Sequence, residues 1–90
     1  MKPIRIPPYC LGRMAARQVD RELVEQAIRS PEQVVPDKDD PARQIHQSRF
    51  VDATGRDKLL RVVVEEHANE VLVVTVYPAS NFKRYWKGET

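Results

Sequence analysis

The sequence predicts an α+β domain in which two N-terminal helices pack on one face of a four-stranded antiparallel sheet. Three observations lead to this fold class: helical spacing of apolar residues up to residue 30, alternating apolar residues from residue 43 onward, and turn-forming residues between the alternating runs. Ninety residues suffice for one small domain with a single apolar core. We therefore expect residues 1–90 to form one domain.

The first helix is expected over residues 9–18, YCLGRMAARQ. Pro8 suits the first helical position, because a backbone N–H would have no helical partner there. Tyr9, Arg13 and Arg17 follow each other at intervals of four and form one stripe of this helix. A separate apolar stripe contains Cys10, Leu11, Met14 and Ala15.

The second helix is expected over residues 21–29, RELVEQAIR, with Asp20 as its N-cap. Pro31 ends it, because the residue before a proline avoids helical dihedral angles. Val34 and Val35 then predict a short strand, which precedes the polar loop PDKDDP.

Three longer strands are expected over residues 43–51, 58–66 and 70–78. In the last two, the pairing that buries Leu60, Val62 and Val64 together with Leu72, Val74 and Val76 places the remaining residues on the opposite face. That register predicts three cross-strand pairs on the open face: Arg61 with Thr75, Leu59 with Tyr77, and Val63 with Val73.

Composition and charge exclude several classes of protein. The single cysteine, Cys10, excludes an internal disulfide, and with only two histidines a structural zinc site is not expected. The N-terminal MKPIRIPPY lacks the apolar run of a signal peptide or a membrane span, so we expect a cytoplasmic protein. We also expect that the protein needs no cofactor. Net charge is only +2, but the acidic residues gather in two expected loops. The basic residues on the helices and strands could therefore form a positive face, and the alternative is a solvated surface of mixed charge.

The chain resembles a family of small bacterial domains of unknown function that is grouped with RelE- and ParE-like toxins and colicin D-like ribonucleases. The resemblance covers about Tyr9 to Tyr85 and rests on YCLGRMAARQVDRELVEQAIRSPEQV and on the strand ending VVTVYP. Matching positions are Arg13 with Met14, Arg17, Pro31 with Glu32, and Thr75 with Val76 and Tyr77. The family histidine falls on Tyr9 in this chain.

The resemblance implies a RelE-like fold, a toxin-type domain and a ribonuclease that acts on RNA, with a small acidic antitoxin protein and a homodimer as expected partners. Metal-independent cleavage needs a base, an acid and cations that stabilise charge on the phosphate. We expect Arg61 in the phosphate role, because a guanidinium offers a charged planar fork of donors. The alternative is a cross-strand arginine on a solvated face.

Tyr77 and Tyr85 are the candidate proton donors or acceptors, although a phenol with a pKa near 10 must be depressed to act as a base. His46 is the candidate imidazole, provided that its strand brings it to the Arg61 face; otherwise it is a structural histidine. A non-catalytic module of the same fold that binds protein or nucleic acid is the alternative to the ribonuclease.

Further cations are expected to contact RNA. Arg13 and Arg17 on the first helix are candidates, with ion pairs to Glu22 or Glu25 as the alternative, and Arg49 lies on the same strand as His46. The segment NFKRYWK predicts a terminal turn of helix capped by Ser80 or Asn81 and closed by Gly88. Its aromatic face contains Phe82, Tyr85 and Trp86, and its cationic face contains Lys83, Arg84 and Lys87. We expect Phe82 and Trp86 to pack on the sheet, and Tyr85 with the cations to face RNA.

Overall fold

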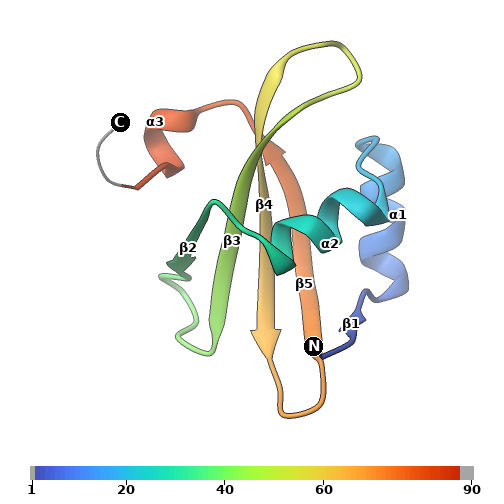
Figure 1. The fold of residues 1–90 in the computed structure, drawn as a ribbon, viewed down its shortest axis with the longest axis vertical. Helices are drawn as coiled ribbons and strands as arrows, with labels where there is room; N and C mark the ends of the chain where they lie inside the picture. The colour runs from blue at the N-terminus through green and yellow to red at the C-terminus, as the bar shows by residue number, and fades with distance from the viewer. Residues whose placement is uncertain (1, 88–90) are drawn as a thin grey trace.

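The computed structural model describes residues 2–87, whose helices and strands form an α+β arrangement (Figure 1). The helices are α1 (Pro8–Ala16), α2 (Arg21–Arg29) and the short α3 (Phe82–Tyr85). The strands are β1 (Ile4–Arg5), β2 (Gln33–Pro36), β3 (Arg43–Val51), β4 (Asp57–Glu66) and β5 (Val71–Ala79). The expected helices and the three long strands are therefore present, each within a few residues of its expected bounds.

The sheet has five strands in the order β1-β5-β4-β3-β2, and not the four antiparallel strands that the sequence predicts. The added strand is β1, which pairs in parallel with β5 through Ile4 opposite Val71. Only two residues long and close to Pro3 and Pro7, β1 is too short to show an alternating pattern. The expectation of an all-antiparallel sheet was wrong for this edge.

The predicted register of β4 with β5 was also wrong. Arg61 lies opposite Tyr77, and Val63 lies opposite Thr75. An irregularity between Val63 and Val64 shifts the pairing by one residue, so Val64 lies opposite Val73. Such a bulge reverses the face on which the following residues lie. Val74 consequently packs on the open face, while Val73 takes its place in the core.

The main core lies between the helices and one face of the sheet. Asp20 caps α2 as expected, because its side chain accepts the Leu23 N–H at 2.9 Å. Side chains from both helices and three strands are buried there, among them Cys10, Met14, Val24, Ala27, Leu60, Val62 and Val76. The helix-facing triplet of β4 is therefore confirmed, even though its partners on β5 differ.

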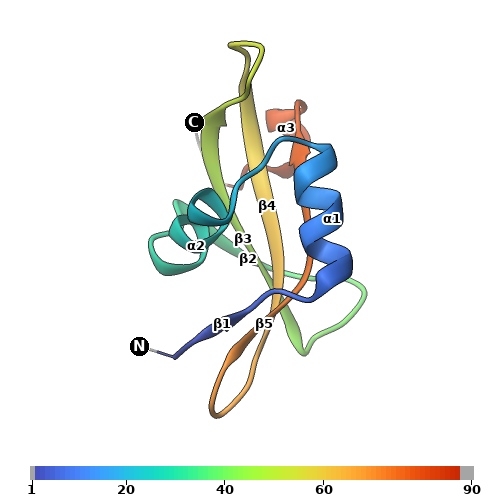
Figure 2. The same cartoon turned by 90° about the vertical axis from the view of Figure 1, so that its right-hand side faces the viewer.

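The other face of the sheet is covered in part by α3. Figure 2 shows α2 and α3 on opposite sides of the sheet. The expected cap is present, since the Asn81 side chain accepts the Arg84 N–H at 3.2 Å. The helix ends at Tyr85, earlier than residue 87, and the expected closing residue Gly88 lies outside the described residues. A small apolar cluster of Val35, Ile45 and Val63 lies beside α3 on this face.

Candidate functional site

Arg61 is the centre of the site on the α3 side of the sheet. It lies in the middle of β4 and is only 7% exposed, so it is not the solvated cross-strand arginine of the alternative interpretation. Its Nε donates to Gln47 Oε1 at 3.0 Å, and its Nη1 donates to the Tyr77 hydroxyl. Both partners are neutral, and within residues 2–87 no carboxylate lies at ion-pair distance from this guanidinium.

Two aromatic rings lie against the Arg61 guanidinium. Its Cζ is 4.0 Å from the centre of the Tyr85 ring and 5.5 Å from that of Tyr77. Such cation–π contacts stabilise a cation without neutralising it. Arg61, Tyr77 and Tyr85, the residues singled out in the sequence for the phosphate and proton-transfer roles, therefore lie together, although Tyr85 comes from α3 and the other two from the sheet. In the part of the chain that the structure describes, no hydrogen bond occupies the Tyr85 hydroxyl.

Gln47, which the sequence analysis did not single out, connects Arg61 to α3. Its side chain is fully buried, and its amide donates to Gln33 Oε1 at 2.8 Å and to the Tyr85 carbonyl at 2.9 Å. Gln33 in turn donates to the Lys87 carbonyl and accepts the Lys87 N–H. These hydrogen bonds fix the terminal segment over the sheet and hold the Tyr85 ring against Arg61. The sequence does contain a signal for Gln47: it is a polar residue at a strand position where alternation allows burial, and a buried amide needs hydrogen-bond partners.

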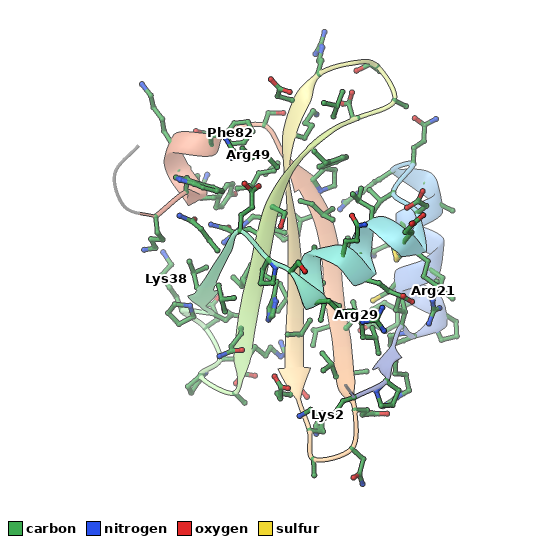
Figure 3. All side chains as sticks on the ribbon, in the orientation of Figure 1. Lys2, Arg21, Arg29, Lys38, Arg49 and Phe82 are labelled. Carbon is green, nitrogen blue, oxygen red and sulfur yellow. The ribbon has the colours of Figure 1, made fainter. Side chains whose placement is uncertain are left out.

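A cavity of about 420 Å³ opens over Arg61, between α3 and the loop that joins β2 to β3. Its volume lies in the range of small-molecule sites. Lys38, Arg84 and Lys87 line it together with Arg61, and Asp37 and Asp39 line it from the loop. Figure 3 shows Lys38 and Phe82 on the side of the molecule that carries β2 and α3, away from Arg21 beside α1. The site thus combines a buried cation, aromatic rings and further cations.

His46 does not approach this cavity, so that part of the prediction was wrong. It pairs with Val62 across β3 and β4 and therefore points to the helix face, whereas its neighbour Gln47 points to the Arg61 face. Both ring nitrogens are buried without a well-formed hydrogen bond from any described residue. Burial lowers the pKa of His46, and the Ala27 carbonyl at the end of α2 partly opposes this decrease.

The lowered pKa predicts that His46 makes the protein less stable in mild acid. The unfolded chain binds the proton more readily than the folded one, so the free energy of unfolding should fall as the pH drops from about 6.5 towards the lower folded pKa. Urea unfolding at several pH values from about 7.5 to 5 measures this slope. We expect His46→Phe to flatten the slope in this range, whereas His67→Asn should retain it because it leaves His46 intact. Equal slopes for His46→Phe and the unsubstituted protein would contradict this account of the buried imidazole.

The stripe that contains Tyr9, Arg13 and Arg17 lies along the outer edge of β5 and not in the Arg61 cavity. The Tyr9 hydroxyl donates to the Val74 carbonyl at 2.8 Å, and Arg17 donates to the Val76 carbonyl at 3.3 Å. Interaction with the Cys10 side chain raises the pKa of Tyr9, which makes its phenol a weaker candidate for a base. Arg13 is exposed on the same helix. The alternative pairing with Glu25 is wrong, since Glu25 pairs with Arg21 and Arg29.

Arg49 and Lys83 lie outside the lining of the Arg61 cavity. Arg49 pairs with Glu32 at 2.7 Å and lies 5.5 Å from the centre of the Trp86 ring, and its side chain is 65% exposed. Trp86 therefore packs over a β3 side chain. Arg84 and Lys87 are the terminal cations that do line the cavity.

A family model described as "Domain of unknown function (DUF4258)" matches residues 10–78 of the chain. The comparison with curated proteins and the comparison with solved structures gave no match. The match covers most of α1 and β5 and all of α2, β2, β3 and β4, and it includes Arg61, Gln47 and Tyr77. Tyr85 and the rest of α3 lie beyond it.

Two absences hold for residues 2–87, the part of the chain that the structure describes. None of their helices is long and apolar enough to cross a membrane. Nor do three or more histidine, cysteine, aspartate or glutamate side chains among residues 2–87 gather in a way that could hold a metal ion.

Proposed function

This chain belongs to the DUF4258 family of domains of unknown function, and we propose that its Arg61 cavity binds a phosphate of the RNA backbone. The observation that carries the proposal is a buried guanidinium whose described partners are all neutral. A buried charge without a counterion is unfavourable, and a bound anion removes that penalty. The planar donor fork of arginine matches the oxygens of a phosphate group.

The surroundings of Arg61 favour RNA over a free phosphate ion. The Tyr85 ring offers a surface for base stacking, and Lys38, Arg84 and Lys87 add charge that neighbouring phosphates can contact. Single-stranded RNA is recognised in this way, with bases on aromatic rings and phosphates on cations. The sequence also resembles a family of small domains that is grouped with RelE- and ParE-like toxins and colicin D-like ribonucleases, which favours the same substrate class.

Cleavage of the bound RNA is a second candidate function, and the two phenols beside Arg61 favour it. In this reaction the 2′-oxygen attacks the adjacent phosphorus and the bond to the 5′-oxygen breaks, which gives a 2′,3′-cyclic phosphate and a 5′-hydroxyl. Arg61 would stabilise the negative charge on the phosphate oxygens, and the Tyr85 hydroxyl would protonate the leaving 5′-oxygen. A base must accept the proton of the 2′-hydroxyl.

Binding ranks before cleavage because the described lining of the cavity contains no imidazole, and its two carboxylates, Asp37 and Asp39, are weaker bases than an imidazole. His46 lies on the other face of the sheet, and Tyr9 donates its hydroxyl proton to a carbonyl on the β5 edge. A small acidic antitoxin would be suited to the same site, since its carboxylates could pair with the cations of the cavity.

Fluorescence anisotropy with a labelled RNA whose sugars are 2′-O-methylated tests binding, because such RNA cannot be cleaved through its 2′-oxygen. We expect a Kd of about 1–100 μM at low salt that weakens steeply as salt is added. Unmethylated RNA incubated with EDTA and resolved on a gel tests cleavage, and induced expression tests growth arrest. If the RNA binds saturably and is not cleaved, the binding function stands and the ribonuclease function is ruled out. The absence of salt-sensitive binding would contradict the proposal itself.

A further inference from the structure

The cavity over Arg61 also contains two carboxylates, which phosphate binding does not use. Asp37 and Asp39 line it from the loop between β2 and β3. Neither forms an ion pair within residues 2–87, although Lys38, Arg84 and Lys87 line the same cavity. Carboxylates repel phosphate, so at an RNA site they need a different role. Hydrogen-bond donors of a nucleobase are the groups that they can bind.

We propose that the Asp39 carboxylate binds the Watson–Crick edge of a guanine adjacent to the phosphate that Arg61 holds. This inference rests on the proposed function, since it names the nucleotide that the same cavity prefers. Asp37 acts as a positioning residue: one of its side-chain oxygens accepts the Asp39 N–H at 2.9 Å. The exposed Asp39 side chain keeps both of its oxygens available.

Guanine fits a carboxylate better than the other three bases do. Its N1–H and its 2-amino group lie side by side and point in the same direction, so they can donate to the two oxygens of one carboxylate. Adenine and cytosine present one amino group beside a ring nitrogen that accepts, and uracil presents one N–H between two carbonyl oxygens. Each of these bases therefore places at least one lone pair against the carboxylate, which is repulsive.

The remaining walls of the cavity suit the base and its phosphate together. The Tyr85 ring and the apolar side chains of Val35 and Ile45 line it, so a flat base can be partly removed from water. The loop is anchored on the sheet, because Asp37 N–H donates to the Arg43 carbonyl at 3.3 Å and Arg43 N–H donates to the Asp40 carbonyl at 3.0 Å. Asp39 thus lies in a short loop that backbone hydrogen bonds hold to the sheet.

The experiment uses 2′-O-methylated uridine pentamers that carry guanine, adenine, cytosine, uracil or hypoxanthine at the central position. Their Kd values for the full chain are measured by fluorescence anisotropy. We expect the guanine pentamer to bind at least about 10-fold more tightly than the uracil pentamer. Hypoxanthine lacks the 2-amino group, so its pentamer should lose at least about a third of that preference on a logarithmic scale.

Two variants with the same change in charge separate recognition from repulsion. Asp39→Asn should remove the preference for guanine, whereas Asp57→Asn at the start of β4, outside the cavity lining, should leave it unchanged. Equal affinity of the unsubstituted protein for all pentamers would overturn the inference. So would an Asp39→Asn variant that binds every pentamer more tightly by the same factor, because the carboxylate would then only repel RNA. Either result leaves phosphate binding by Arg61 intact, whereas no binding of any pentamer contradicts the proposed function as well.

Discussion

Replacement of Arg61 by methionine is expected to weaken RNA binding by about 2–3 kcal/mol, or about 30- to 150-fold in Kd. Methionine fills much of the space of the arginine stem but offers no donor to a phosphate. The loss should exceed that of any exposed cation, because residue Arg61 is buried and its interactions are weakly screened. Anisotropy titration with 2′-O-methylated RNA provides the measurement.

The matched control is Arg56→Met, which removes the same charge from the turn between β3 and β4, outside the cavity lining. We expect it to change the Kd by less than about 3-fold, as is usual for a screened surface charge. Arg61→Lys keeps the charge but loses the fork of donors, so it should lie between the two. Comparable affinity of Arg61→Met and Arg56→Met would show that RNA, if it binds, is held by surface charge alone. Thermal unfolding verifies that each variant is folded.

The second large effect is expected for Gln47→Glu, which places a carboxylate beside the Arg61 Nε with almost no change in shape. The buried ion pair would supply the counterion that Arg61 otherwise takes from its ligand, so we expect RNA binding to fall at least about 30-fold. The new carboxylate would also face the Gln33 side-chain oxygen and the Tyr85 carbonyl, to which Gln47 now donates. Loss of these two hydrogen bonds should destabilise the fold by about 2–4 kcal/mol in urea unfolding.

Gln47→Leu separates the two consequences. It loses the same hydrogen bonds to Gln33 and Tyr85 but leaves Arg61 without a carboxylate. We expect it to be destabilised to a similar extent and yet to retain more RNA affinity than Gln47→Glu. If both variants lost binding equally, the position of the terminal segment, and not the charge of the cavity, would control the affinity.

Much of the fold could be predicted from the sequence because strong local signals coincide with the observed elements. Asp20 and Pro31 bracket α2, and alternating residues mark the long strands. The register of β4 with β5 could not be predicted, because β5 reads VLVVTVYPA and places aliphatic side chains on both faces. Either alignment buries three aliphatic residues of β5, so the sequence pattern does not reveal the bulge at Val63 and Val64.

The candidate site could be predicted only in its aromatic and cationic members. Arg61, Tyr77 and Tyr85 were singled out by residue type, and the structure brings their side chains together. Gln47 was missed because a single amide in a strand carries no charge, and its importance comes from three partners distant in sequence. The face of His46 could not be predicted, since Ile45 and Val51 at one parity of β3 compete with His46 and Phe50 at the other.

The most direct test of the central claim is the NMR signal of the Arg61 Nε–H during titration with 2′-O-methylated RNA. Binding of a phosphate in the cavity predicts a saturable shift of this signal, accompanied by shifts of the Tyr77 and Tyr85 ring protons, with a midpoint equal to the anisotropy Kd. Shifts confined to exposed lysines and arginines, with the Arg61 signal unchanged at saturation, would contradict the account.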